Sequence, residues 1–252
     1  MKQKVSVKPF ILCYNDFGKE WTARVNERFK GTRAELPEDL QPNQELENMH
    51  LIKRLGLITA SYHNPQLRST NILSVTPLQF EQLLQANNLP KDPRTYWENL
   101  ALALYDRSSK GSNLKEAQAL HVSLQQHRTE LGLSSADLEQ RLLIVHAGLE
   151  KDDSMPHGVK PVILPGLTEV YVHDTLRLGG VYLFAYGLDR GLPAVKTLGN
   201  GSRRLYLPQG KNIGLRALFR GRDLGLLAWD MGLVYSDADG RVTCARQGAQ
   251  KS

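Results

Sequence analysis

The chain has 252 residues, of which 41% are hydrophobic and 23% charged, a composition typical of a globular protein with a sizeable core. Its formal net charge is +6 and its isoelectric point is about 9.3. Two cysteines exclude a disulfide-dense secreted scaffold, and no apolar run reaches the roughly eighteen residues needed to cross a bilayer. We therefore expect a cytoplasmic protein without a membrane partner.

The first part of the sequence predicts helices. Apolar side chains recur every four residues between an Asp16 cap and Gly31, which predicts a helix over 16–30 with a stripe of Phe17, Trp21, Val25 and Phe29. Thr76 and Pro77 are an N-cap and a first helical residue, so another helix begins there. The same reasoning gives helices near residues 44–55, 95–106, 114–131 and 135–149.

Residues 51–85 have a pattern of their own. A helix ends at Leu55-Gly56, "LITASY" and "TNILSVT" are expected as strands around the polar turn "HNPQLRS", and Thr76-Pro77 opens the next helix. This helix–hairpin–helix order resembles the wing region of winged-helix DNA-binding proteins. The resemblance implies that Arg68 lies at the wing tip and that Lys53 and Arg54 end the helix before it.

The last third is rich in glycine and in short alternating runs, which are typical of strands and turns. We therefore expect an α+β fold with a helical part over 1–150, which holds the winged-helix segment, and a β-rich basic part over 151–252. Polar and turn-forming residues cluster at 151–161 and predict the boundary there.

The positive charge is concentrated in the second part. Residues 1–150 carry 18 basic and 17 acidic side chains, whereas residues 151–252 carry 14 and 9. The thirty-three residues from Arg190 to Arg222 contain eight Lys or Arg and no Asp or Glu. From Ile213 onward apolar residues alternate with Arg216 and Arg220, which predicts a strand with a basic, solvent-facing side. An exposed face without acidic residues favours binding to phosphates.

Nucleic acid is therefore the expected partner, with DNA favoured and a regulatory or mobile-element role the most natural one. An RNA-binding or RNA-processing subunit is the alternative, and an interaction protein with an acidic partner is the second alternative. An oligomer or a multi-subunit complex stays open. The candidate nucleic-acid-binding residues are Arg203, Arg204, Tyr206, Lys211, Arg216, Arg220 and Arg222 in the basic stretch and Arg68, Lys53 and Arg54 in the wing region.

The sequence contains no Walker A, GxSxG or HExxH pattern. His146, Asp152, Asp153, His157, His173 and Asp174 lie within 29 residues, but nothing in their spacing forces them together. We expect no metal and no cofactor, and the pattern favours a binding protein over an enzyme. No catalytic residue is identified, and a metal-independent RNA-cleaving site built from His or Tyr near the basic sheet has no signature in one sequence.

Overall fold

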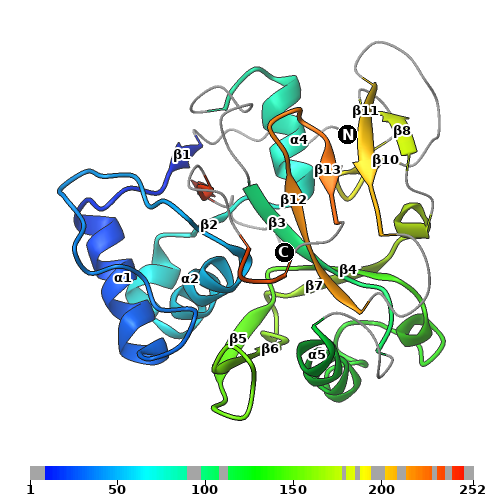
Figure 1. The fold of residues 1–252 in the computed structure, drawn as a ribbon, viewed down its shortest axis with the longest axis horizontal. Coiled ribbons are helices and arrows are strands. Elements are labelled where there is room, and N and C mark those ends of the chain that lie inside the picture. The colour runs from blue at the N-terminus through cyan, green and yellow to red at the C-terminus, as the bar shows by residue number, and fades with distance from the viewer. Residues whose placement is uncertain are drawn as a thin grey trace.

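The computed structural model contains helices and sheets, as the sequence predicts. Figure 1 shows α1 (Asp16–Phe29) and α2 (Leu51–His63) side by side, at one end of the molecule. No helix in the described part of the chain is long and apolar enough to cross a membrane. The residues that the structure describes are 9–89, 98–107, 113–177, 180–184, 188–193, 202–208, 214–228, 232–235 and 240–246.

The remaining α-helices are α3 (Pro65–Ser69), α4 (Pro77–Gln85) and α5 (Leu114–Gln126), and the short 3-10 helices are Asp137–Glu139 and Asp174–Arg177. The side chain of Asn15 caps α1 by accepting a hydrogen bond from the backbone N–H of Gly18. This cap lies one residue before the expected Asp16. Thr76 and Gln79 form a reciprocal capping box, with Pro77 at the first helical position. The helices expected at 16–30 and after Thr76 are thus confirmed, and α5 confirms most of the one expected at 114–131.

The strands are β1 (Phe10–Ile11), β2 (Ile72–Ser74), β3 (Glu98–Leu104), β4 (Leu142–Val145), β5 (Gly148–Lys151), β6 (Val159–Val162), β7 (Glu169–Val172), β8 (Gly180–Leu183), β9 (Leu188–Asp189), β10 (Leu192–Pro193), β11 (Ser202–Tyr206), β12 (Leu215–Arg220), β13 (Leu226–Leu227) and β14 (Thr243–Arg246). The largest sheet has the order β7-β4-β3-β12-β13-β11-β8. Its neighbours run antiparallel except for β11 and β13, which are parallel. A smaller sheet of order β1-β14-β2 joins segments near both ends of the chain.

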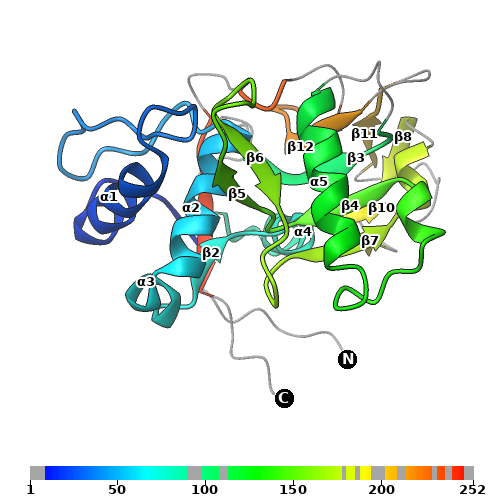
Figure 2. The ribbon, with the colours of Figure 1, turned by 90° about the horizontal axis from the view of Figure 1, so that it is seen from below.

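Both faces of the large sheet are covered. Leu102, Leu142 and Leu215 pack with Leu120 of α5 in one apolar cluster. Residues that point the other way along the same strands pack with Phe80 and Leu83 of α4 in a second cluster. Figure 2 shows α5 and the β5-β6 hairpin on the side of the sheet nearer to the viewer. The central strands β4 and β12 therefore bury both of their sides.

Two of the expected helices are strands. Residues 98–104 of the helix expected at 95–106 form β3. The second half of the one expected at 135–149 holds β4 and the start of β5, and its first half holds only the short 3-10 helix Asp137–Glu139. All four residues of β4, Leu-Leu-Ile-Val, are buried. A short apolar run of this kind fits a strand covered on both faces, and helical spacing over such a run is accidental.

The expected wing hairpin is also wrong. Residues 57–62 continue α2, Arg68 lies in α3 instead of at a hairpin tip, and only β2 remains of the two expected strands. Gly56 does not end α2 but lies within it. A Cβ there would lie 3.4 Å from the side chain of Ala34 and 3.5 Å from that of Val25 in α1. This glycine marks the close approach of two helices.

The boundary expected at 151–161 falls within the β5-β6 hairpin, which packs against α5 and α2. The large sheet combines β3 and β4 from before this point with β7, β8 and β11–β13 from after it. A division of the chain at residue 151 would therefore separate hydrogen-bonded strands of one sheet.

Candidate anion-binding site

The cations expected on the open face of β12 are buried. Arg216 and Arg220 do alternate with the apolar residues, as predicted, but they are only 7% and 0% exposed. Their side of the sheet is the one that α4 covers, so the predicted solvent face does not exist. The absence of acidic residues from the local sequence does not mean that the charge meets solvent.

The neutralising carboxylate comes from α4. Glu81 is fully buried and forms ion pairs with both Arg203 and Arg220. The guanidinium of Arg203 also lies 4.2 Å from the ring centroid of Phe184. Burial lowers the pKa of Arg203 to about 10 and that of Arg220 to about 9, against the opposing effect of Asp223, so both stay charged at neutral pH. These two arginines have a structural role.

The other expected binding residues are scattered. Arg54 is 2% exposed, and its Nη2 donates a hydrogen bond to the backbone oxygen of Val75 at 2.9 Å. Arg204 is exposed over the ring of the half-buried Tyr206, and Arg222 and Arg68 are exposed elsewhere. Lys53 is half-buried at the start of α2, and Lys211 lies outside the described residues. Of the expected residues, Arg204, Arg222 and Arg68 are thus exposed, whereas Arg54 is not.

The histidines and aspartates of 146–174 stay apart. The Nε2 atom of His146 lies 2.9 Å from the backbone oxygen of Ser74, and His173 pairs with Asp189. Burial lowers the pKa of His146 to about 4. Asp152 bonds Ser154 in an exposed turn, and Asp174 begins a 3-10 helix. Within the described ranges, no three His, Cys, Asp or Glu residues lie close enough together to hold a metal ion.

A different group of basic residues does converge. Arg33 follows α1, His50 is the N-cap of α2, Lys53 lies in the first turn of α2, and His157 lies in the β5-β6 turn. We call these four residues the α2 cation cluster. The backbone N–H of Arg33 donates to the backbone oxygen of His157 at 3.1 Å, and the side chain of His50 accepts from the backbone N–H of Lys53. The first contact joins two segments distant in sequence, and the second fixes the start of α2.

The charges that act on His50 and Lys53 are one-sided. Burial lowers the pKa of His50, and the charges of Lys53, Arg33 and His157 act in the same direction, so that the pKa lies at about 3. Burial and the charge of Arg33 also lower the pKa of Lys53. Among the described residues no carboxylate has a resolved effect on either group, and the first turn of α2 has no acidic residue. The positive end of the α2 dipole adds to this field. Like charges held together in this way favour an anion.

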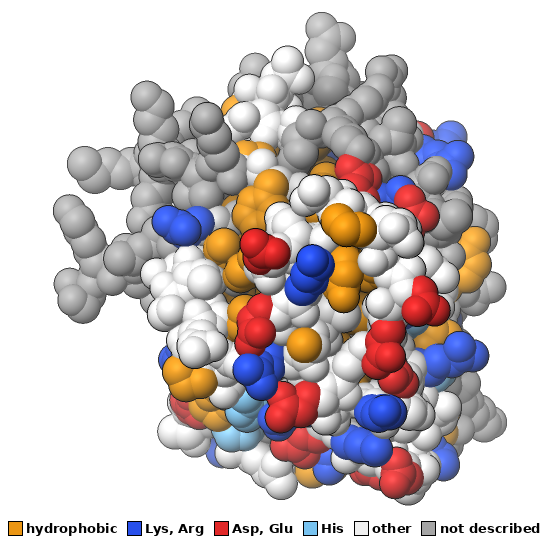
Figure 3. Space-filling model, turned by 90° about the vertical axis from the view of Figure 1, so that its left-hand side faces the viewer, with side chains coloured by type: hydrophobic (Ala, Val, Ile, Leu, Met, Phe, Trp, Pro, Cys, Tyr) orange, Lys and Arg blue, Asp and Glu red, His pale blue; other side chains and the backbone are white. Residues whose placement is uncertain are grey.

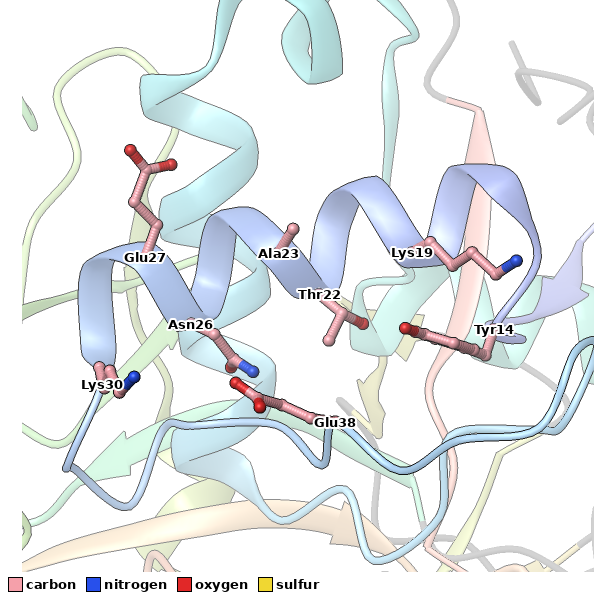
Figure 4. A pocket seen from close by; sticks show the side chains of 8 residues that line it. All are labelled: Tyr14, Lys19, Thr22, Ala23, Asn26, Glu27, Lys30 and Glu38. Carbon is pink, nitrogen blue, oxygen red and sulfur yellow. The ribbon is translucent and has the colours of Figure 1, made fainter.

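A groove beside α1 carries balanced charge instead. It has a volume of about 450 Å³ and is lined by residues that include two lysines, Lys19 and Lys30, and two glutamates, Glu27 and Glu38. Figure 4 shows Asn26 and Glu38 turned toward each other beneath α1. Figure 3, viewed from the α1 side, shows acidic and basic side chains interspersed. Balanced charges of this kind do not favour a polyanion.

Comparison with known proteins adds no constraint: no protein-family model, no curated protein and no solved structure matches the chain. Of the cluster, only Lys53 stands among the expected binding residues, and His157 was considered for a metal or acid–base site. Arg33 and His50 were missed because nothing in their spacing links them. The only local signal is the lack of acidic residues at the start of α2.

Proposed function

We propose that the protein binds nucleic acid and that the α2 cation cluster holds a backbone phosphate. The observation that carries this proposal is the convergence of Arg33, Lys53 and two histidines on the N-terminal end of α2, where the charges that act on His50 and Lys53 are all positive. Arginine and lysine side chains at a helix N-terminus are typical phosphate ligands. Because such contacts release counterions, the affinity depends steeply on salt.

Three exposed lysines extend the cluster. The Nζ atom of Lys151 donates to the backbone oxygen of Lys30 at 3.1 Å, and that of Lys115 donates to the backbone oxygen of Ser154 at 3.3 Å. These contacts tie the β5-β6 hairpin to the end of α1 and to the start of α5. These lysines are further cations near the ends of α1 and α5, beside a hairpin that also carries the carboxylates of Glu150 and Asp152.

Fluorescence anisotropy tests the proposal, with labelled single-stranded RNA, single-stranded DNA and duplex DNA titrated between about 50 mM and about 200 mM salt. Replacing Arg33 and Lys53 by alanine removes two phosphate ligands. The slope of log K against log salt should then become shallower by about 1.4 for single strands and about 1.8 for the duplex. Failure of the wild-type protein to bind any of the three at low salt would refute the proposed function.

Two further variants of equal net charge locate the contact. The Lys19→Ala/Arg246→Ala variant removes two exposed cations away from the cluster and should keep the wild-type slope. The Arg204→Ala/Arg222→Ala variant probes the exposed arginines of the basic stretch. A greater loss in the latter than in the cluster variant would move the contact to β11 and contradict the assignment. Equal competition by polyglutamate would instead indicate an acidic protein partner.

A further inference from the structure

The α2 cation cluster adjoins a buried carboxylate. Glu116 lies in the first turn of α5 and is 2% exposed, and its Oε1 lies 3.6 Å from Nε2 of His157. That oxygen has no hydrogen-bond partner among the described residues. A buried carboxylate oxygen without a hydrogen bond is costly, and the imidazole of His157 is the charge partner that the structure places beside it.

A second His–Glu pair, just after α5, offers a contrast. His127 and Glu130 also form a pair, at 3.3 Å, but their side chains are 30% and 48% exposed and lie three residues apart on the surface. Glu116 and His157 lie 41 residues apart in sequence, and their side chains are 2% and 18% exposed. His157 is thus oriented by a buried carboxylate, while part of its side chain remains exposed.

The backbone fixes His157 against the cations. Its carbonyl accepts the N–H of Arg33, and the next residue, Gly158, has φ +69° and packs against Thr32. A Cβ at Gly158 would lie 3.2 Å from the side chain of Thr32, and the positive φ would strain any residue that has one. The imidazole therefore lies beside a buried carboxylate, and the backbone of the same residue is hydrogen-bonded to Arg33 of the α2 cation cluster.

We propose that His157, oriented by Glu116, transfers the protons in metal-independent cleavage of RNA bound at the α2 cation cluster. This inference rests on the proposed function and names its substrate. His157 takes the proton of a 2′-hydroxyl, whose oxygen forms a bond to the adjacent phosphorus. The bond from phosphorus to the 5′-oxygen breaks, and the imidazolium gives its proton to that leaving oxygen. The products are a 2′,3′-cyclic phosphate and a 5′-hydroxyl.

Each remaining residue has a defined part in this reaction. Arg33 and Lys53 offset the negative charge that grows on the non-bridging oxygens as phosphorus becomes five-coordinate. Glu116 is a positioning residue that holds the imidazole. His50 is neutral at pH 7, because its pKa lies near 3, so it cannot supply the leaving-group proton. DNA lacks the 2′-hydroxyl and is bound but not cleaved.

The decisive substrate is a DNA oligonucleotide that contains a single ribonucleotide, incubated with the full chain in EDTA. Cleavage should occur only on the 3′ side of that ribonucleotide and leave a cyclic phosphate, which mass spectrometry detects. His157→Ala should lower kcat by about 10²–10⁴-fold with little change in the dissociation constant. Added imidazole should restore part of the rate in that variant. Glu116→Gln should lower kcat at an unchanged dissociation constant, and His127→Ala should behave as wild type.

Each other outcome has one meaning. Wild-type protein that binds the oligonucleotide without cutting it would make Glu116–His157 a structural ion pair, leaving the proposed function intact. Equal cleavage by wild type and by His157→Ala, purified in parallel, would assign the activity to another site or to a contaminant and would also overturn the inference. Absence of binding would instead refute the proposed function. Circular dichroism identifies a misfolded His157→Ala protein, in which case His157→Gln and Glu116→Gln decide the question.

Discussion

Glu81 should be one of the most sensitive positions in the molecule. Its carboxylate is fully buried between Arg203 and Arg220, and Arg220 is itself 0% exposed. Glu81→Gln removes the negative charge while nearly preserving the shape of the side chain, so a buried guanidinium loses its counterion. Loss of one partner of a buried pair costs about 3–5 kcal/mol of unfolding free energy, a large part of the stability of an ordinary domain.

Urea unfolding followed by tryptophan fluorescence measures this loss. The exposed pair of Arg24 and Glu27 is the control, and Glu27→Gln should leave the urea midpoint almost unchanged. The triple variant Glu81→Leu/Arg203→Leu/Arg220→Met should recover most of the stability, because the apolar replacements remove the buried charges together. A midpoint for Glu81→Gln as high as that of Glu27→Gln would refute the structural role of the two arginines.

Three further predictions concern pH and packing. Burial lowers the pKa of His146 from 6.5 to about 4, so its neutral form favours the fold. The contribution of this histidine to stability is constant above pH 6.5 and falls below it, by up to about 1.4 kcal/mol per pH unit. His146→Gln should reduce that slope in urea melts. Gly56→Ala should keep or raise the thermal midpoint, because the added methyl makes ordinary contacts with α1, whereas Gly56→Leu should cost about 1–3 kcal/mol. Gly191→Ala should greatly lower the midpoint, because its Cβ would lie 2.3 Å from the backbone of Pro77, and Gly31→Ala, at a similar positive φ in open space, should lower it less.

The sequence was sufficient where one element decides its own structure. The stripe of α1, the Thr76-Pro77 start of α4 and the alternation along β12 depend on neighbours within a few residues, and all three are correct. It failed where coverage by distant elements decides. β3 reads as alternating leucine and alanine because its leucines face α5 and its alanines face the α4 side, yet the same letters also suit a helix.

Charge counting along the chain fails for the same physical reason. The acid-free stretch is bounded by Asp189 and Asp223, and Asp223 acts on both Arg203 and Arg220. Its principal counterion, Glu81, lies 122 residues from Arg203 in sequence. A window of sequence measures local composition, whereas neutralisation acts over a few ångströms of space.

The converse holds at the α2 cation cluster. Residues 31–53 contain five acidic side chains and only two Lys or Arg, so composition makes this segment look acidic. Several of the acids point elsewhere: Glu35 bonds the backbone of Gly31, and Glu45 and Glu47 pair with Arg241 near the other end of the chain. With those carboxylates engaged, Arg33 and Lys53 are left to act on each other and on His50. A positive site thus arises within an acidic segment, because the fold pairs its carboxylates with groups outside the α2 cation cluster. Composition along the chain does not show this pairing.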